Sequence, residues 1–189
     1  MDKVISEYKI AKEIFAMGKD IIMAPEAQKM KEFIQHGTTS VFEHTVSVAK
    51  FSLIFAIALE NIGIKFDHRS LVRGALLHDY FLYDWHEKNK YHNLHGFTHP
   101  KRAHNNAVRD FVLNDIEKDI IKKHMFPLTI IPPNKRESWL VCMADKWCAI
   151  CETFKIDISS QIIYRINLHY ELTNGNIKIG RKKASRNVE

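Results

Sequence analysis

The stretch LVRGALLHD, residues 71–79, decides the fold, because an apolar helical run ends there in an adjacent imidazole and carboxylate, His78 and Asp79. Its apolar residues recur at helical spacing, and Asp67 can cap the helix at its start. Burying an ionised carboxylate alone is costly, so Asp79 must pair, become protonated or bind a metal. The stretch therefore predicts a buried helix that carries metal-binding chemistry into a core.

Outward from this stretch, helical spacing of apolar residues covers most of the chain. Ser40 and Asn114 each precede a Glu by three residues, which predicts capping boxes at two helix starts. Glycine (7) and proline (5) are scarce, which disfavours a turn-rich β architecture. We predict an all-α fold of about six to eight helices in one domain, residues 1–189. The expected helices span 3–17, 25 to about 37, 41–59, 67–79, 98–111, 114–124, about 135–154 and about 159–172.

The composition and the charge distribution argue against a disordered chain and against a nucleic-acid-binding protein. Hydrophobic residues make up 46% of the chain and charged residues 26%, an ordinary globular mixture that excludes a disordered chain. The net charge is +6, and residues 165–189 hold six basic against two acidic residues, so the basic character reflects the tail more than the body. A nucleic-acid partner is therefore not expected.

No signal sequence is visible at the start of the chain. The longest apolar run, Phe51 to Leu59, is nine residues, whereas a helix needs about 20 to cross a bilayer. Three cysteines, two of them in the pair Cys148 and Cys151, suggest helix packing in a reducing compartment. We expect a cytoplasmic protein with no membrane partner, and an oligomer is compatible with the sequence.

Four polar residues fall on helix faces that should be buried. His44 heads an apolar helix stripe, His78 and Asp79 end another, and Asp145 lies within the apolar stretch WLVCMADKWC. Each one alone could be a satisfied core residue, for example Asp145 paired with Arg73 or Lys146. Together, two imidazoles and two carboxylates from three helices suit a divalent metal.

This ordered set resembles the HD superfamily of metal-dependent phosphohydrolases, whose pattern is H…HD…D. His78 follows His44 by 34 residues and Asp145 follows Asp79 by 66, in the contexts VFEHTVSVA, LVRGALLHD and VCMADKWCA. The resemblance covers about 36–155, with N-terminal helices in 1–35 and a C-terminal helix and basic tail in 156–189. It implies an all-α HD-domain bundle. It also implies a hydrolase that cleaves a phosphate ester or anhydride, of a small nucleotide, with a metal-activated hydroxide.

Two further histidines resemble those of the binuclear HD branch, namely His99 in FTHPKRA and His124 in IIKKHMFPL. The resemblance implies two divalent ions, such as Fe or Mn, with Asp79 bridging them. One alternative is a single metal, with these two histidines lining the pocket. His104 competes with His99 for the ligand position, because it lies five residues further on. The implied ligands are His44, His78, Asp79, His99, His124 and Asp145.

The chain departs from the HD-GYP proteins, because no H-D-I-G-K follows the pair and no G-Y-P follows the last histidine. A cyclic-di-GMP phosphodiesterase is therefore not expected. The role of the missing lysine is either absent or taken by another cation, for which Lys146, Arg73 and Lys101 are the candidates. The aromatic- and His-rich segment 80–98 is interpreted as a substrate wall, with a simply packed loop as the alternative. The candidates are Asp79, Lys146 and Arg73 for catalysis, and Tyr80, Tyr83, Trp85, His86 and Lys101 for substrate binding.

Two other functions fit the same residues. The first is a mononuclear, nucleotidase-type phosphomonoesterase. The second is a non-catalytic HD signalling or binding domain that has kept the fold. The complete H…HD…D set argues against the second, because a degenerate domain is free to lose its ligands.

Overall fold

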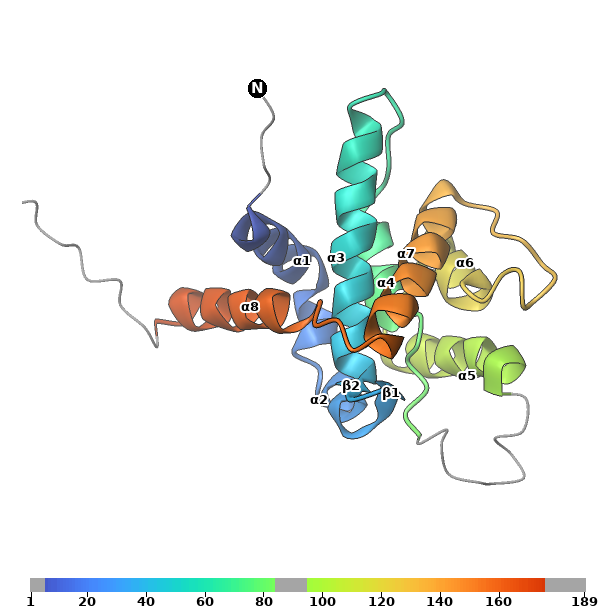
Figure 1. Cartoon of the computed structure of the whole chain (residues 1–189), viewed down its shortest axis with the longest axis horizontal. Helices are drawn as coiled ribbons and strands as arrows, with labels where there is room; N and C mark the ends of the chain where they lie inside the picture. Colours follow the sequence, from blue (N-terminus) through green and yellow to red (C-terminus); the bar gives the residue numbers. More distant parts are fainter. Residues whose placement is uncertain (1–5, 84–94, 176–189) are drawn as a thin grey trace, which may run out of the picture.

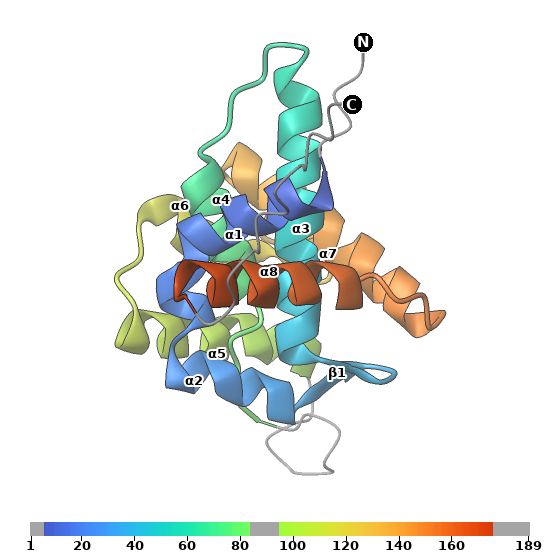
Figure 2. The same ribbon diagram turned by 90° about the vertical axis from the view of Figure 1, so that its left-hand side faces the viewer.

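The computed structural model of the chain describes residues 6–83 and 95–175, and Figures 1 and 2 show it from two sides. In these two ranges the chain forms eight α-helices, one 3-10 turn (η1) and one short hairpin, so the predicted all-α fold is confirmed. The elements are α1 (Glu7–Ile22), α2 (Pro25–Gln28), η1 (Lys29–Glu32), β1 (Ile34–His36), β2 (Thr39–Ser40), α3 (Val41–Glu60), α4 (His68–Leu77), α5 (His95–Asp110), α6 (Asp115–Lys123), α7 (Arg136–Thr153) and α8 (Ser160–Thr173).

The long helix α3 is the centre of the arrangement. Its most extensive contacts are with α4 and α7, while α4 also packs on α1 and α6. Figure 1 shows α3 upright between α8 on one side and α7 on the other, and Figure 2 shows α8 crossing in front of α3. One hydrophobic cluster runs through all of these helices, from Ile10 in α1 to Ile166 in α8.

Both predicted capping boxes are present. The backbone N–H of Ser40 donates to Glu43 Oε2 at 2.8 Å, and that of Glu43 donates back to Ser40 Oγ at 3.3 Å. Asn114 and Glu117 exchange the same pair of bonds at 3.0 and 2.9 Å. These boxes satisfy amide groups that a helix start leaves unpaired, and so they fix where α3 and α6 begin.

The close approach of α4 and α6 depends on Gly74. A Cβ atom at this position would lie 2.4 Å from Cδ1 of Ile120, closer than real Cβ contacts. Because Gly74 has no side chain, the two helices approach until Ile120 rests on the α4 backbone. This contact brings the C-terminal ends of α4 and α6 into the same core. His78 lies at the end of α4 and His124 at the end of α6.

The structure differs from the predicted helices mainly at three places, and in the first of them α1 ends at Ile22, five residues later than expected. The helix expected from residue 25 to about 37 ends at Gln28, and residues 34–40 form the hairpin of β1 and β2 instead. Gly37 adopts a φ of +58° in the hairpin turn, a conformation that ends a helix and that glycine tolerates. Helix α5 begins at His95, three residues earlier than expected.

The nine-residue apolar run is part of a longer apolar helix. Helix α3 has 20 residues and a mean hydropathy of 1.5 over its most apolar window, which is enough by length and composition to cross a membrane. However, 61% of that window is buried inside the structure, and His44 lies within the helix. Such burial is the pattern of a core helix.

Candidate metal centre

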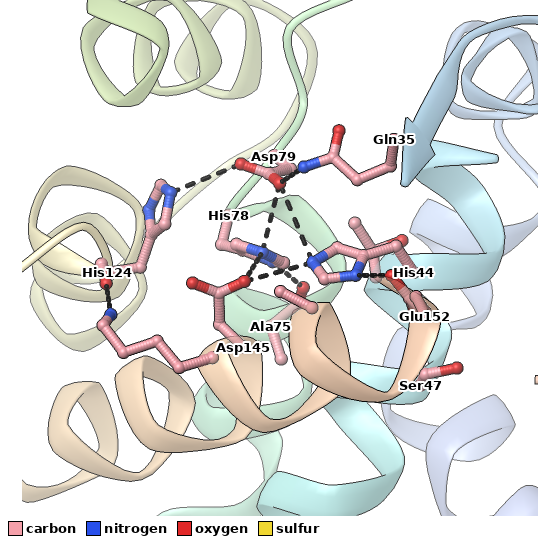
Figure 3. Close-up of polar contacts among 12 residues, drawn as sticks. Gln35, His44, Ser47, Ala75, His78, Asp79, His124, Asp145 and Glu152 are labelled. Carbon is pink, nitrogen blue, oxygen red and sulfur yellow. Dashed lines mark hydrogen bonds and ion pairs between the residues drawn. The ribbon is translucent and has the colours of Figure 1, made fainter. Parts of the chain in front are cut away.

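Four polar side chains from α3, α4 and α7 meet at one end of α3 (Figure 3). His44 Nε2 lies 3.1 Å from Asp145 Oδ1. His78 Nε2 lies 3.6 Å from the same oxygen and 3.5 Å from Asp79 Oδ2. All four residues are buried, with exposed fractions between 0% and 8%. The structure thus brings together the four residues that form the H…HD…D pattern.

The second oxygen of Asp79 faces a different pair of histidines. Asp79 Oδ1 lies 3.1 Å from His99 Nε2 and 3.3 Å from His124 Nε2, and these two nitrogens are 2.8 Å apart. Asp79 therefore stands between two groups of ligand atoms, one on each carboxylate oxygen. In each group the ligand atoms of three residues converge to within 4.8 Å of one another: His44, His78 and Asp79 in one, and Asp79, His99 and His124 in the other.

The imidazole rings are held by their other nitrogen atom. Nδ1 of His78 lies 2.8 Å from the carbonyl oxygen of Ala75, and Nδ1 of His124 lies 2.9 Å from that of Ile121. Nδ1 of His44 lies 2.8 Å from Glu152 Oε2. Each of these acceptors calls for a proton on Nδ1, so Nε2 is the nitrogen that each ring presents to the cluster.

These residues fit a divalent metal. His78 Nε2 is buried and has no hydrogen-bond partner among the described residues. His99 and His124 turn two nitrogens towards each other and towards a carboxylate oxygen, an arrangement that one cation between the three atoms satisfies. Imidazole nitrogens and carboxylate oxygens are ligands that Zn, Mn and Fe accept.

The electrostatics of the cluster keep its carboxylates ionised. Burial alone would raise the pKa of Asp79, but the charges of His78 and His99 and a hydrogen bond from His124 lower it well below its ordinary value. Burial alone would likewise lower the pKa of His44, yet its hydrogen bonds to Asp145 and Glu152 raise it to about 10. At His124 burial dominates and lowers the pKa, which favours the neutral form that binds metals.

A cavity of about 690 Å³ opens directly onto the cluster. Asp79, His99 and Asp145 form its floor, and Lys146 and Ala149 continue one wall along α7. Gln35 and His36 of β1 also line it, and three apolar wall residues come from the chain between α6 and α7: Met125, Pro127 and Leu128. The cavity thus combines the ligand cluster, one cation and an apolar wall.

The two candidate histidines of α5 lie in different surroundings. His99 is 3% exposed and belongs to the cluster, whereas burial and the nearby charge of Lys122 lower the pKa of His104, which lies beside α6. The five-residue step between them turns the two side chains to different faces of the helix.

Two candidates for the catalytic and substrate-binding set lie away from the cavity. Arg73 is buried in an ion-pair network with Glu117, at 2.7 Å, and Asp20, because its position on α4 faces α1 and α6. Tyr80 is 0% exposed, and its hydroxyl donates to Asp110 at 2.9 Å. Both expectations are corrected: these residues stabilise the packing between helices.

The remaining candidates are placed as follows. Lys146 lines the cavity, and its ammonium donates to the His124 carbonyl oxygen at 3.0 Å. Tyr83 packs against Phe81 and lies under the guanidinium of Arg102, and Lys101 is exposed on α5. Trp85 and His86 lie outside the described residues.

Three residues of the site were missed from the sequence. Glu152 lies seven residues after Asp145, two turns along the same face of α7, and this spacing could have revealed it. Gln35 donates to Asp79 Oδ2 at 2.6 Å, and His36 lies beside His44 with ring centroids 5.6 Å apart. Gln35 and His36 belong to the hairpin that was expected to be helix, so no periodicity pointed to them.

The comparisons with known proteins agree with the geometry. A family model described as HD domain matches residues 41–150, which span α3 to most of α7. Among curated proteins and among solved structures, no significant match is found.

Proposed function

Because the chain belongs to the HD-domain family, whose members are mostly metal-dependent hydrolases, we propose that it is a phosphohydrolase with a two-metal site. It cleaves a phosphate ester or anhydride of a small nucleotide. The observation that carries the proposal is the position of Asp79, whose two oxygens face two separate pairs of histidines. A carboxylate placed in this way is suited to bridge two ions.

The ligands divide naturally between the two positions. His44, His78 and Asp145 would hold one ion with Asp79 Oδ2, and His99 and His124 would hold the other with Asp79 Oδ1. When bound, such ions lower the pKa of a shared water and neutralise charge on phosphoryl oxygens. Glu152 and the carbonyl oxygens of Ala75 and Ile121 keep the imidazoles aimed at the ions.

The rest of the cavity suits the substrate proposed. Lys146 supplies a positive charge beside Asp145 for a phosphate group. The apolar wall formed by Met125, Pro127 and Leu128 offers a surface for a flat base. A volume of about 690 Å³ falls within the range of sites for small molecules.

The test combines metal analysis with a substrate panel. The purified protein is loaded with Mn²⁺ or Fe²⁺ and assayed on nucleoside monophosphates, triphosphates and cyclic nucleotides, and on phosphate esters without a base. We expect two ions per chain and hydrolysis of at least one nucleotide class. The isosteric variant Asp79→Asn should lose at least about 100-fold in activity, while His104→Ala should keep it.

The other outcomes identify the alternatives. One ion per chain under metal excess, with phosphomonoesterase activity, would establish the mononuclear enzyme. Metal binding without hydrolysis of any phosphate in the panel would favour a non-catalytic domain.

A further inference from the structure

Helix α7 carries a row of large apolar side chains on its outer face. Figure 1 shows α7 on the outside of the bundle, and among the described elements it contacts mainly α3, α4 and α6, with a smaller contact to β1. Exposed apolar patches of this size mark interaction surfaces. The row, called here the α7 stripe, consists of Trp139 (41% exposed), Met143 (57%), Trp147 (49%), Ile150 (54%) and Phe154 (74%).

The spacing of the α7 stripe is that of a helix–helix seam. Met143, Trp147, Ile150 and Phe154 follow one another at intervals of four, three and four residues. This alternation keeps side chains on one narrow line of a helix, which is how two helices pack along each other. The inner face of α7 is already buried in the core, so the stripe is a second apolar face that is available to a partner helix.

The surface is large enough for a stable dimer. The ring of Trp139 contacts Phe126 at a centroid distance of 5.4 Å, so the chain between α6 and α7 continues the stripe. It adds Ile130 and Ile131, which are 89% and 63% exposed. At roughly 100 Å² of exposed area for each of these seven side chains, the patch of about 700 Å² comes close to the about 800 Å² per partner of a standard interface.

The charges around the stripe fit an antiparallel pairing of two copies. The acidic residues of α7, namely Glu137, Asp145 and Glu152, are all buried, and Lys135 and Arg136 are exposed at its N-terminal end. A parallel pair would bring these cations of both copies together. An antiparallel pair instead places them near the partner's helix C-terminus, where the helix dipole is negative and the exposed charges of Lys155 and Asp157 balance each other.

We propose that a second copy of this chain docks on the α7 stripe, with the two α7 helices antiparallel across a two-fold axis. Such an interface uses the same patch on both copies and closes on itself. The cavity residues Lys146 and Ala149 directly precede Trp147 and Ile150 on α7. The partner's α7 therefore lies beside the mouth of the cavity.

Sedimentation velocity and light scattering of the full-length protein, over a wide concentration range, test the proposal. We expect a dimer for the wild type. Met143→Glu and Ile150→Glu should each raise the dimer dissociation constant by at least about 100-fold, because a charge would be buried without a partner. Ile62→Glu, at a 73% exposed site between α3 and α4, should remain dimeric. Circular dichroism confirms that the variants are folded.

Cysteine crosslinking tests the direction of the helices. In the antiparallel pair, residue 147 of one copy faces residue 150 of the other. A mixture of Trp147→Cys and Ile150→Cys proteins should therefore crosslink more than either variant alone, and the native cysteines are buried.

Four results would overturn the proposal. They are a wild-type monomer at all concentrations, a dimer that both glutamate variants leave intact, crosslinking of each cysteine variant with itself alone, and binding of a monomeric wild type to phosphatidylserine vesicles. The last result would assign the stripe to a lipid surface. None of these outcomes depends on the proposed hydrolase activity.

Discussion

His44 Nδ1 lies 2.8 Å from Glu152 Oε2, although the two residues are 108 positions apart in the chain. The carboxylate fixes which nitrogen of the ring carries the proton, and so it keeps His44 Nε2 free for a metal.

Replacing this carboxylate should weaken metal binding while the protein stays folded. Glu152→Gln keeps the size of the side chain but weakens the hydrogen bond that it accepts from His44 Nδ1. We expect metal affinity to fall about 10- to 100-fold. Isothermal titration with Mn²⁺ measures the effect. The control is Glu137→Gln, another buried carboxylate of α7, which accepts from the backbone of Asp67 at 3.0 Å. Equal loss of affinity in both variants would mean that Glu152 acts only on helix stability.

His99 and His104 should differ in metal content. His99→Ala removes a side chain that lies 3.1 Å from Asp79 Oδ1, so the metal content should fall from two ions per chain to one. His104→Ala should retain both ions, because this residue lies beside α6. Elemental analysis after gel filtration gives the count. A loss of metal in His104→Ala alone would reassign the ligand.

Arg73 should matter for stability and leave the metal count unchanged. Its guanidinium is 5% exposed and pairs with Glu117, itself 3% exposed. Arg73→Met leaves that carboxylate buried without its partner, which costs about 3–5 kcal/mol in the free energy of unfolding. Urea denaturation measures the loss, and Arg69→Met, an exposed site on the same helix, serves as the control. An unchanged midpoint for Arg73→Met would contradict the structural role.

Gly74→Ala should push α4 and α6 apart. The added methyl group overlaps Ile120 Cδ1, and overpacking of this kind costs about 1–3 kcal/mol. Removing that atom with Ile120→Val should recover part of the loss in the double variant. Thermal unfolding of the four proteins in the cycle decides whether the two sites are coupled. Additive effects would show that the overlap relaxes elsewhere.

Trp85 lies outside the described residues, and its role stays a prediction from the sequence. If its ring stacks on a base, Trp85→Ala should raise KM for a nucleotide by about 5- to 150-fold. KM for a base-free phosphate ester should change much less. Steady-state kinetics on one substrate of each kind measure both values, and an equal rise on both would indicate that Trp85 packs its own segment.

The helices were predictable because local rules fix them. The two capping boxes and the apolar spacing gave the starts of α3 and α6 and the course of α7 within a few residues. The hairpin was missed because three residues in β1 and two in β2 are too few to show an alternating period.

Within the site, the sequence revealed residues whose polarity conflicts with an apolar helix, such as His44 and Asp145. The predicted site wrongly included Arg73 and Tyr80. The face of a helix that lines a cavity is decided by the helices packed around it, and these are distant in the sequence. Tyr80 follows Asp79 directly, yet its hydroxyl donates to Asp110 at the end of α5, and the residue does not line the cavity. Proximity in sequence did not mean proximity to the site.

His78 and His124 each stand at the C-cap of a helix, and each Nδ1 lies within hydrogen-bond distance of a carbonyl oxygen three residues earlier. Helix ends leave such carbonyl groups without partners. Each ring therefore contacts the last turn of its own helix through Nδ1 and presents Nε2 to the cluster. The two rings acquire their orientation when α4 and α6 form. An arriving ion therefore meets ligands that are already oriented, and its binding requires little further ordering of the chain.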